Sequence, residues 1–348
     1  RVPLTLAGPV VVLAAGADEN GRGAMMTTSL DMQTLTTCVQ TAALAPSLHN
    51  SQPWRFQIDG GTVEVFADRG RQLEVLDPSG RELLISVGAA VFTLRLAIGM
   101  QARTPQVIIF PDPARPELVA RIRTSQVTTP SVQVRDLAAV ISSRHTNRRP
   151  FMNAVVPADV MEQLCAAAAH EGATLTQAGA VTRDAIVGLA QTAEARLRAH
   201  GGYRAELGQW TQPRPHRRDG IPPTAYGPWD ALEHLPLRDF GLVHPYPQRT
   251  AARFEAHPTI AVLATEGDTP AAWVRAGQAL QRVLLTATRH HLATTPISQP
   301  VEIPAVRDLL TDPATGRTAQ MIIRLGYAAP AAATPRRPLT DILESGQP

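Results

Sequence analysis

Residues 45–56 read APSLHNSQPWRF, and this stretch carries the most specific information about the fold. Before it, residues 31–45 place apolar side chains at helical spacing, and Pro46 ends the predicted helix. After it, residues 54–58 and 62–67 alternate in polarity and are joined by Asp-Gly-Gly, which predicts a β-hairpin. The stretch is therefore predicted to link a helix to a hairpin.

The same stretch is a candidate binding loop. It combines the hydroxyl of Ser47, the amide of Asn50 and a turn that follows Pro46. Such groups can satisfy a ribityl chain and the edge of a planar heterocycle that both donates and accepts hydrogen bonds. The alternative is a capped turn in which Trp54 fills the core, and the stretch alone does not decide between the two.

Outward from this loop, the order of predicted elements occurs twice. Both parts contain a long core helix, at 81–100 and at 270–291, accompanied by short strands. Other predicted elements are strands at 107–110, 118–122, 259–264 and 320–325, helices at 134–142, 158–170 and 183–200, and a final short helix in the tail. We expect an α+β fold with an N-terminal extension (1–30) and two related halves (31–133 and 134–348), each a mixed sheet around long core helices.

Residues 208–247 interrupt the second half. The segment is too rich in proline for regular structure and too aromatic for a disordered linker. We expect a long ordered insertion that lies over a site like a lid, with Trp210, Tyr226 and Trp229 as its walls.

A basic segment, residues 144–151 with the sequence RHTNRRPF, is the second candidate binding feature. Arg144, Thr146 and Arg148 alternate, so an extended conformation would direct all three to one side, as binding of a phosphate requires. Arg336 and Arg337 supply a second pair of arginines in the tail. A solvated basic loop is the alternative interpretation.

Composition excludes several classes of function. A net charge of +3 is too small to imply a nucleic-acid or membrane partner. The two cysteines, Cys38 and Cys165, are expected to be buried free thiols in a reducing compartment, consistent with a cytoplasmic protein. No metal-ligand spacing is present, and the pair Met25-Met26 suggests that the natural start lies there.

Together, the PSxxNxQPW-like loop, the arginine segment TNRRPF and the Arg-Pro-Leu tail resemble the nitroreductase family of FMN enzymes. The arginine segment in mid-chain resembles the Acg branch of that family. The resemblance implies a pseudo-dimer folded from one polypeptide, with one FMN per chain and no second chain required. It also implies hydride transfer from NAD(P)H through FMN to a nitroaromatic, quinone or similar acceptor. The alternatives are a non-catalytic flavin-binding or flavin-sequestering protein with a closed lid, and a specialised flavin dehydrogenase or FMN-degrading enzyme on the same scaffold.

Carried over by position, the resemblance predicts a cofactor site built from both halves. The predicted FMN contacts are Pro46, Ser47, Asn50, Arg144, Thr146, Arg148, Ser298 and Arg336. Thr334 stands where the family often has Lys, and residues 295–300 lack the glycine that commonly faces the flavin. No catalytic side chain is assigned, because the flavin supplies the chemistry, so His49, His290 and His291 are expected to be structural.

Overall fold

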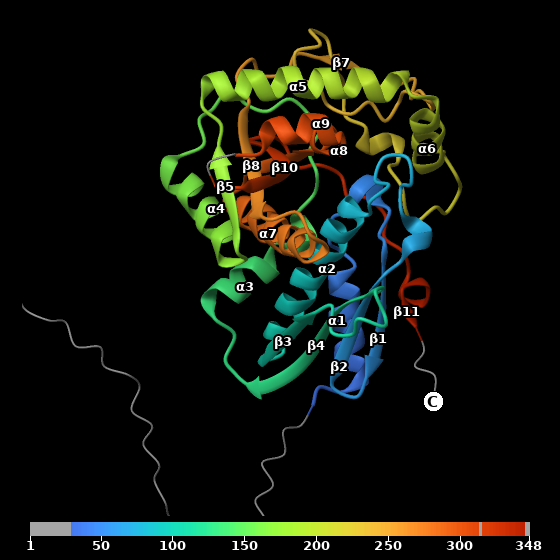
Figure 1. Ribbon diagram of the computed structural model, residues 1–348, viewed down its shortest axis with the longest axis vertical. Coiled ribbons are helices and arrows are strands. Elements are labelled where there is room, and N and C mark those ends of the chain that lie inside the picture. The colour runs from blue at the N-terminus through green and yellow to red at the C-terminus, as the bar shows by residue number, and fades with distance from the viewer. Residues whose placement is uncertain (1–28, 313–314, 345–348) are drawn as a thin grey trace, which may run out of the picture.

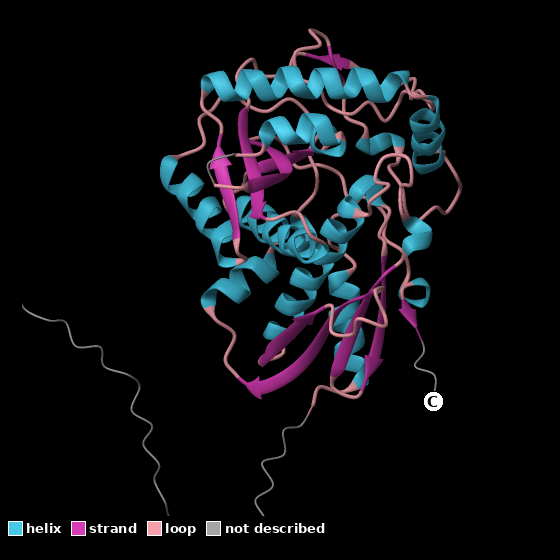
Figure 2. Cartoon of the chain, viewed as in Figure 1, coloured by secondary structure: helices cyan, strands magenta, loops and turns pink. Residues whose placement is uncertain are grey.

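The computed structural model describes residues 29–312 and 315–344, which form two sheets and a set of helices (Figures 1 and 2). The first sheet has the strand order β11-β1-β2-β4-β3 and the second the order β5-β8-β10-β9. Their strands are β1 (Trp54–Asp59), β2 (Thr62–Ala67), β3 (Arg103–Ile109), β4 (Leu118–Val127), β5 (Ala173–Gln177), β8 (Thr259–Glu266), β9 (Ala293–Ile297), β10 (Arg317–Gly326) and β11 (Leu343–Glu344). The short strands β6 (Trp229–Asp230) and β7 (Ala251–Ala252) pair separately.

The α-helices pack between and around these sheets. They are α1 (Met32–Ala42), α2 (Arg81–Met100), α3 (Val132–Ala139), α4 (Ala158–His170), α5 (Ala180–Ala199), α6 (Gly201–Thr211), α7 (Pro270–Arg289), α8 (Gln299–Glu302) and α9 (Pro304–Arg307). One apolar core joins α1 and α2 to β1, β2 and β4, and another joins α4 and α7 to β5, β8 and β10. Each sheet therefore has a long helix as its main covering element.

Helices α2 and α7 meet at the centre of the molecule through two glycines (Figure 1). A Cβ added to Gly88 would lie 2.2 Å from the carbonyl oxygen of Val274, and one added to Gly277 would lie 2.0 Å from that of Ile85. In each case the obstructing carbonyl is three residues before the other glycine. The contact is thus reciprocal, as in an isologous interface, and only glycine allows the helices to approach this closely.

The second hairpin strand and the helix at 81–100 have the predicted bounds, and the first hairpin strand is one residue longer than predicted. Helix α2 is also long and apolar enough to cross a membrane, but 89% of that window is buried inside the protein. Such burial is typical of the core helix of a globular protein. The prediction of an extension over residues 1–30 falls largely outside the described residues.

Strands β5 and β9 were not predicted, and two further parts of the chain differ from the prediction. Residues 208–247 are not wholly irregular, since α6 continues to Thr211 and a 3-10 helix covers Pro223–Ala225. In the tail, the predicted final helix is a single 3-10 turn, Leu339–Asp341, and it is followed by β11. Strand β11 pairs in parallel with β1, so the tail of the 134–348 segment belongs to the first sheet.

The cysteines also differ in part from expectation. Both are free thiols, and Cys38 is buried as predicted, but Cys165 is only half-buried. Burial raises the pKa of the Cys38 thiol to about 11, which makes it a poor nucleophile.

Candidate functional site

A cavity is lined by residues from the 31–133 segment, the 134–348 segment and the 208–247 insertion. The loop at 45–56 lines it with Pro46, Ser47 and His49, and helix α2 adds one face of its first turns. Residues Thr146 and Arg148 approach from the basic segment, and the end of β9 and the start of α8 complete the wall. Segments far apart in the sequence therefore converge on one space, as is usual for a ligand site.

The loop at 45–56 is held in an unusual conformation. His49, Asn50 and Gln52 all have positive φ values, of 49°, 53° and 50°. Ser47 Oγ accepts a hydrogen bond from the backbone N–H of Gln52 at 2.9 Å, and Ser86 Oγ accepts one from the N–H of Leu48 at 3.2 Å. Such strained backbone persists only where surrounding contacts determine it, which is common at functional sites.

Asn50 does not line the cavity, although it was predicted as a direct contact. Its amide donates to the carbonyl oxygens of Gly220 and Pro335, both at 3.0 Å. Its carbonyl oxygen accepts from Arg336 at 3.1 Å. Asn50 therefore ties the binding loop to the insertion and to the tail.

Arg144 and Arg336, which we call the arginine pair, lie together beside the loop. Both donate to the carbonyl oxygen of Leu44, at 3.4 Å and 3.2 Å, and the Nε atom of each is buried without a partner. Among the described residues, neither forms an ion pair. Burial, reinforced by the charge of Arg336, lowers the pKa of Arg144 to about 9, and burial lowers that of Arg336 to about 10. The positive charge of the arginine pair is not compensated by a carboxylate among the described residues, and an anion bound there would compensate it.

Thr146 and Arg148 follow a different course from Arg144, so the three side chains do not form one clamp as predicted. The segment runs beside β9, where Thr146 bridges to Thr294 and the N–H of Asn147 donates to the Thr294 carbonyl at 2.9 Å. This geometry places Thr146 and Arg148 on the cavity and leaves Arg144 outside its lining. The three residues alternate in sequence as predicted, but the path of the segment beside β9 separates Arg144 from Thr146 and Arg148.

The insertion covers the cavity through residues that the sequence did not single out. Leu237, Arg238 and Phe240 line the cavity, whereas Trp210, Tyr226 and Trp229 do not. Tyr226 is instead buried in an apolar cluster that joins the insertion to Leu73, Leu76 and α6, and Trp229 is 60% exposed. The lid stays a prediction. The aromatic residues predicted as its walls do not line the cavity, because Tyr226 packs into that cluster and Trp229 is largely exposed.

Phe240 joins the insertion to both halves of the site. Its ring centroid lies 5.2 Å from that of His49 in an edge-to-face arrangement, and the guanidinium of Arg148 lies 4.7 Å above it. Arg148 also donates to the carbonyl oxygen of Ala225 at 3.0 Å. These contacts hold the insertion against the cavity.

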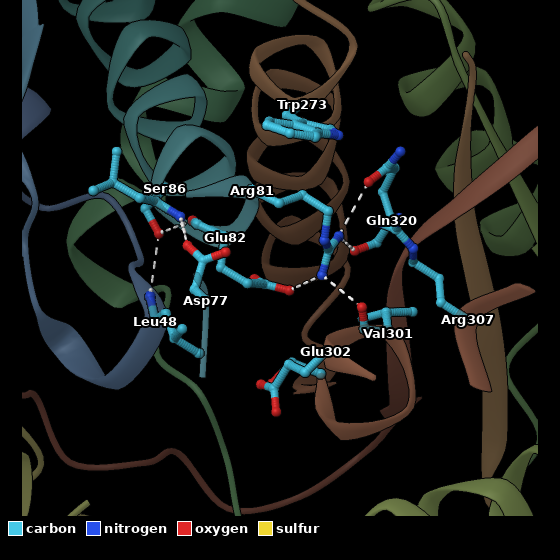
Figure 3. Close-up of polar contacts among 12 residues, drawn as sticks. Leu48, Asp77, Arg81, Glu82, Ser86, Trp273, Val301, Glu302, Arg307 and Gln320 are labelled. Carbon is cyan, nitrogen blue, oxygen red and sulfur yellow. Dashed lines mark hydrogen bonds and ion pairs between the residues drawn. The ribbon is translucent and has the colours of Figure 1, made fainter. Parts of the chain in front are cut away.

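Three buried carboxylates, Asp77, Glu82 and Glu302, stand beside the cavity and are called here the carboxylate cluster (Figure 3). Asp77 accepts from the N–H of Leu83 at 2.8 Å and so caps α2. Both carboxylate oxygens of Glu302 accept a hydrogen bond from Arg238, Oε1 at 2.6 Å and Oε2 at 2.5 Å. Sequence reasoning missed this cluster, although a charged pair at the start of an otherwise apolar helix was an available signal.

Glu82 differs from the other two carboxylates because it lines the cavity directly. Its Oε1 atom accepts a hydrogen bond from Arg81, which also donates to the Gln320 carbonyl at 2.8 Å and the Val301 carbonyl at 3.1 Å (Figure 3). Burial raises the pKa of Glu82 to about 7, against the lowering effect of Arg81. Burial likewise raises the pKa of Asp77 to about 6.

Three of the remaining predicted residues are brought to the cavity. Pro46, Ser47 and Ser298 line it, and Ser298 lies 3.5 Å from Arg238. His290 and His291 lie at the far end of α7 and take no part, while His49 faces the cavity. Within 29–312 and 315–344, no group of His, Cys, Asp or Glu is arranged to hold a metal ion.

Comparison with known proteins places this geometry in a family. The model of the nitroreductase family matches residues 141–327. A Mycobacterium tuberculosis protein named as an NAD(P)H nitroreductase is 34% identical over 95% of this chain and 97% of its own. The M. tuberculosis protein acg, similarly named, is 32% identical over 91% of this chain and 97% of its own.

Solved structures give weaker likenesses. The FMN-dependent nitroreductase NfnB from Mycobacterium smegmatis, determined with NADPH, is 19% identical, covers 61% of this chain and 99% of its own, and has a TM-score of 0.37. The relation to the M. tuberculosis proteins, by contrast, extends over nearly the whole of each sequence. The chain belongs to the nitroreductase family.

Proposed function

We propose that this protein binds one FMN per chain and transfers hydride from NAD(P)H to a nitroaromatic, a quinone or a similar acceptor. The observation that carries the proposal is the arginine pair. Two buried guanidinium groups share one carbonyl oxygen and have no carboxylate partner among the described residues. A phosphate dianion would supply the missing negative charge and accept from their free Nε atoms.

The donor set fits FMN. Arg144 and Arg336 would hold the phosphate, and Ser47, Thr146 and Arg148 offer hydroxyl and guanidinium groups along the cavity toward a ribityl chain and ring. Bound FMN would supply the hydride chemistry, while the side chains of this chain bind it, orient it and exclude water. Pro46, Ile85 and Ala89 provide the apolar surface that a planar ring requires.

A pseudo-dimer explains how one chain makes one site. The reciprocal contact of Gly88 and Gly277 supports an internal pseudo-twofold axis between α2 and α7. The cavity takes its loop from the first half and its basic segment from the second. A monomer therefore contains both contributors to the proposed site, and the free thiols are consistent with a reducing compartment such as the cytoplasm.

A spectroscopic experiment tests the proposal. Purified protein is mixed with excess FMN, desalted and examined for bound flavin, then treated anaerobically with NADPH and NADH. Flavin bound near one per chain that bleaches with either nucleotide is the expected result. Failure to retain flavin would remove the basis of the assignment.

A second function, flavin binding without turnover, is favoured by the covering insertion. Arg238 is buried and donates hydrogen bonds to both carboxylate oxygens of Glu302. Phe240 contacts both His49 and Arg148. These contacts hold the insertion over the space that a nicotinamide ring would enter. Flavin that binds but stays oxidised with both nucleotides would identify this function instead.

A further inference from the structure

We propose that Glu82 is the proton donor of this site, an inference that rests on the proposed function and assigns a catalytic side chain to it. The proposal begins from position. On α2, Glu82, Ile85, Ser86 and Ala89 form one helical stripe, and this stripe is the part of the helix that lines the cavity. Glu82 is the acidic member of that stripe.

Its hydrogen bonding leaves one carboxyl oxygen available. Arg81 donates to Oε1, and no described residue donates to Oε2 (Figure 3). By contrast, Asp77 caps α2 and does not line the cavity, and both oxygens of Glu302 are occupied by Arg238. Glu82 is therefore the member of the carboxylate cluster with an oxygen free to act on a ligand.

Charge balance favours a proton on this group. The carboxylate cluster contributes three acidic groups, from the loop before α2, from α2 itself and from α8. Two guanidinium groups face them, Arg81 from α2 and Arg238 from the insertion, and Gln320 adds a neutral amide from β10. The three carboxylates that act on one another outnumber these two guanidinium groups by one, which favours retention of a proton on the cluster. The raised pKa of Glu82 agrees with this count.

A neighbouring side chain independently indicates a ligand in this space. His49 is 4% exposed, lines the same cavity and has no partner for either ring nitrogen. Burial, with the charges of Arg238 and Arg148, holds its pKa well below the ordinary value, so the imidazole is neutral. A neutral ring offers one donor and one acceptor, and buried polar atoms normally have partners.

Two hydrogen bonds through Ser86 connect the loop at 45–56 to the backbone of Glu82. The N–H of Leu48 donates to Ser86 Oγ, and the Ser86 hydroxyl donates to the Glu82 carbonyl oxygen at 2.8 Å. The backbone next to His49 is thereby joined to the backbone of Glu82. A ligand that hydrogen-bonds to His49 would lie beside the wall that contains the carboxyl group.

Protonation by Glu82 balances atoms and charge when the acceptor is a quinone. The quinone receives a hydride, which is one hydrogen with two electrons, in the proposed reaction. The O–H bond of Glu82 then breaks, an O–H bond forms on the hydroquinone anion, and the carboxylate left behind takes a proton from water. Neutral His49 supplies a hydrogen bond to the acceptor and is not consumed.

The test compares wild type with Glu82→Gln, using the full chain loaded with FMN and reduced chemically before mixing with a water-soluble benzoquinone. The Gln variant is expected to react about 100-fold more slowly, the range in which general acids act. In wild type, the rate should decline as pH rises through about 7, where the carboxyl ionises. The variant should lack this decline, while Glu82→Asp should retain it.

Infrared spectroscopy supplies a readout that does not depend on turnover. Wild type should show a protonated carboxyl component that disappears with a midpoint near pH 7, and Glu82→Gln should lack this component while it keeps the one from Asp77 with a midpoint near pH 6. Glu206→Gln is the matched control, because Glu206 is also a carboxylate with a raised pKa but lies outside the cavity lining. The control should keep both the component with a midpoint near pH 7 and the rate.

The outcomes separate the inference from the proposed function. A Gln variant that binds FMN and reacts with the quinone at the wild-type rate would overturn the role of Glu82 alone. Absence of the component with a midpoint near pH 7 from wild type would overturn it as well, even if the variant misfolds. Wild-type protein that retains FMN but transfers no electrons from NAD(P)H would overturn the proposed function, while the infrared result would still decide whether Glu82 holds the proton.

Discussion

Two groups of buried arginines flank the cavity, and they differ in what surrounds them. Arg144 and Arg336 form the arginine pair, which meets a backbone carbonyl but no carboxylate among the described residues. Arg81 and Arg238 stand instead among the three members of the carboxylate cluster. One group has an excess of positive charge, and the other has an excess of negative charge.

This contrast assigns a different task to each group. Removing a charge from water is expensive unless a partner compensates it. The arginine pair can be compensated by an anion that arrives with a ligand, so it is suited to binding. The carboxylate cluster can be compensated by a proton, so it is suited to proton exchange.

The largest expected effect comes from removing the arginine pair. The double variant Arg144→Ala, Arg336→Ala should weaken FMN binding by about 3 to 6 kcal/mol, since each charge-assisted contact is worth ~1.5 to 3. Riboflavin, which lacks the phosphate, should bind wild type and variant alike. Fluorescence titration with both flavins measures the difference.

Arg149→Ala is the control for that experiment, because Arg149 is an exposed neighbour in the same segment. It should leave the affinity for FMN unchanged. Equal loss of FMN and riboflavin binding in the double variant would mean that the arginine pair maintains the fold and does not bind phosphate.

The next effect concerns the contact between α2, which carries Arg81, and α7. Gly88→Ala would place a Cβ 2.2 Å from the Val274 carbonyl oxygen, so α2 and α7 must separate. Overpacking of this kind costs about 1 to 3 kcal/mol, and more where backbone must move. Urea unfolding should report this loss of stability together with weaker FMN binding.

Gly188→Ala provides the comparison within a helix, because no atom lies within 4 Å of a Cβ added there. This change should stabilise the protein by roughly 0.5 to 1 kcal/mol through helix propensity. If both alanine variants gained stability, the close approach of α2 and α7 would not limit the fold.

A smaller effect tests the proton held by the carboxylate cluster. Because the pKa of Glu82 is raised to about 7 in the folded protein, its contribution to stability is full below the unfolded value of 4.5 and is lost as pH rises to about 7. Between about pH 5.5 and pH 8, the free energy of unfolding of wild type should therefore decline relative to Glu82→Gln by about 2 kcal/mol. A difference that stays constant with pH would show that Glu82 titrates normally.

The smallest effect concerns access to the cavity between the two groups. Phe240→Ala should raise the rate of NADPH oxidation several-fold, because it removes the ring that contacts both His49 and Arg148. Leu242→Ala removes apolar surface from the same insertion but lies outside the cavity lining. Similar rates in the two variants would mean that Phe240 does not restrict entry.

The sequence predicted those parts of the fold that depend on local pattern. The hairpin follows from alternation around Asp59-Gly60-Gly61, and α2 follows from a long run of small and apolar residues. Strand β11 was missed because two residues carry no periodicity, and their pairing with β1 depends on tertiary contacts. The sequence identified the aromatic residues of the insertion, but composition does not predict whether such side chains face the cavity.

For the candidate site, the sequence singled out the loop at 45–56 and the basic segment, and both contribute residues to the cavity, but it did not predict which of their residues line it. Thr146 and Arg148 reach the cavity while Arg144 joins Arg336, because the segment follows the edge of β9. The carboxylate cluster was missed because Glu302 comes from a part of the chain distant from Asp77 and Glu82. Only folding reveals that Glu302 and Glu82 influence one another.

The pairing of β11 with β1 also bears on when this site can form. Arg55 on β1 and Glu344 on β11 are joined by an ion pair although they lie 289 residues apart in the sequence. Arg336, in the same tail, contacts Asn50 across a similar separation. A ribosome makes the chain from its N-terminus, so the edge of β1 and the contacts of Asn50 with the tail stay incomplete until nearly all of the protein has emerged. The arginine pair is then among the last parts of the molecule to assemble, and a nascent chain lacking this tail would lack the proposed phosphate site.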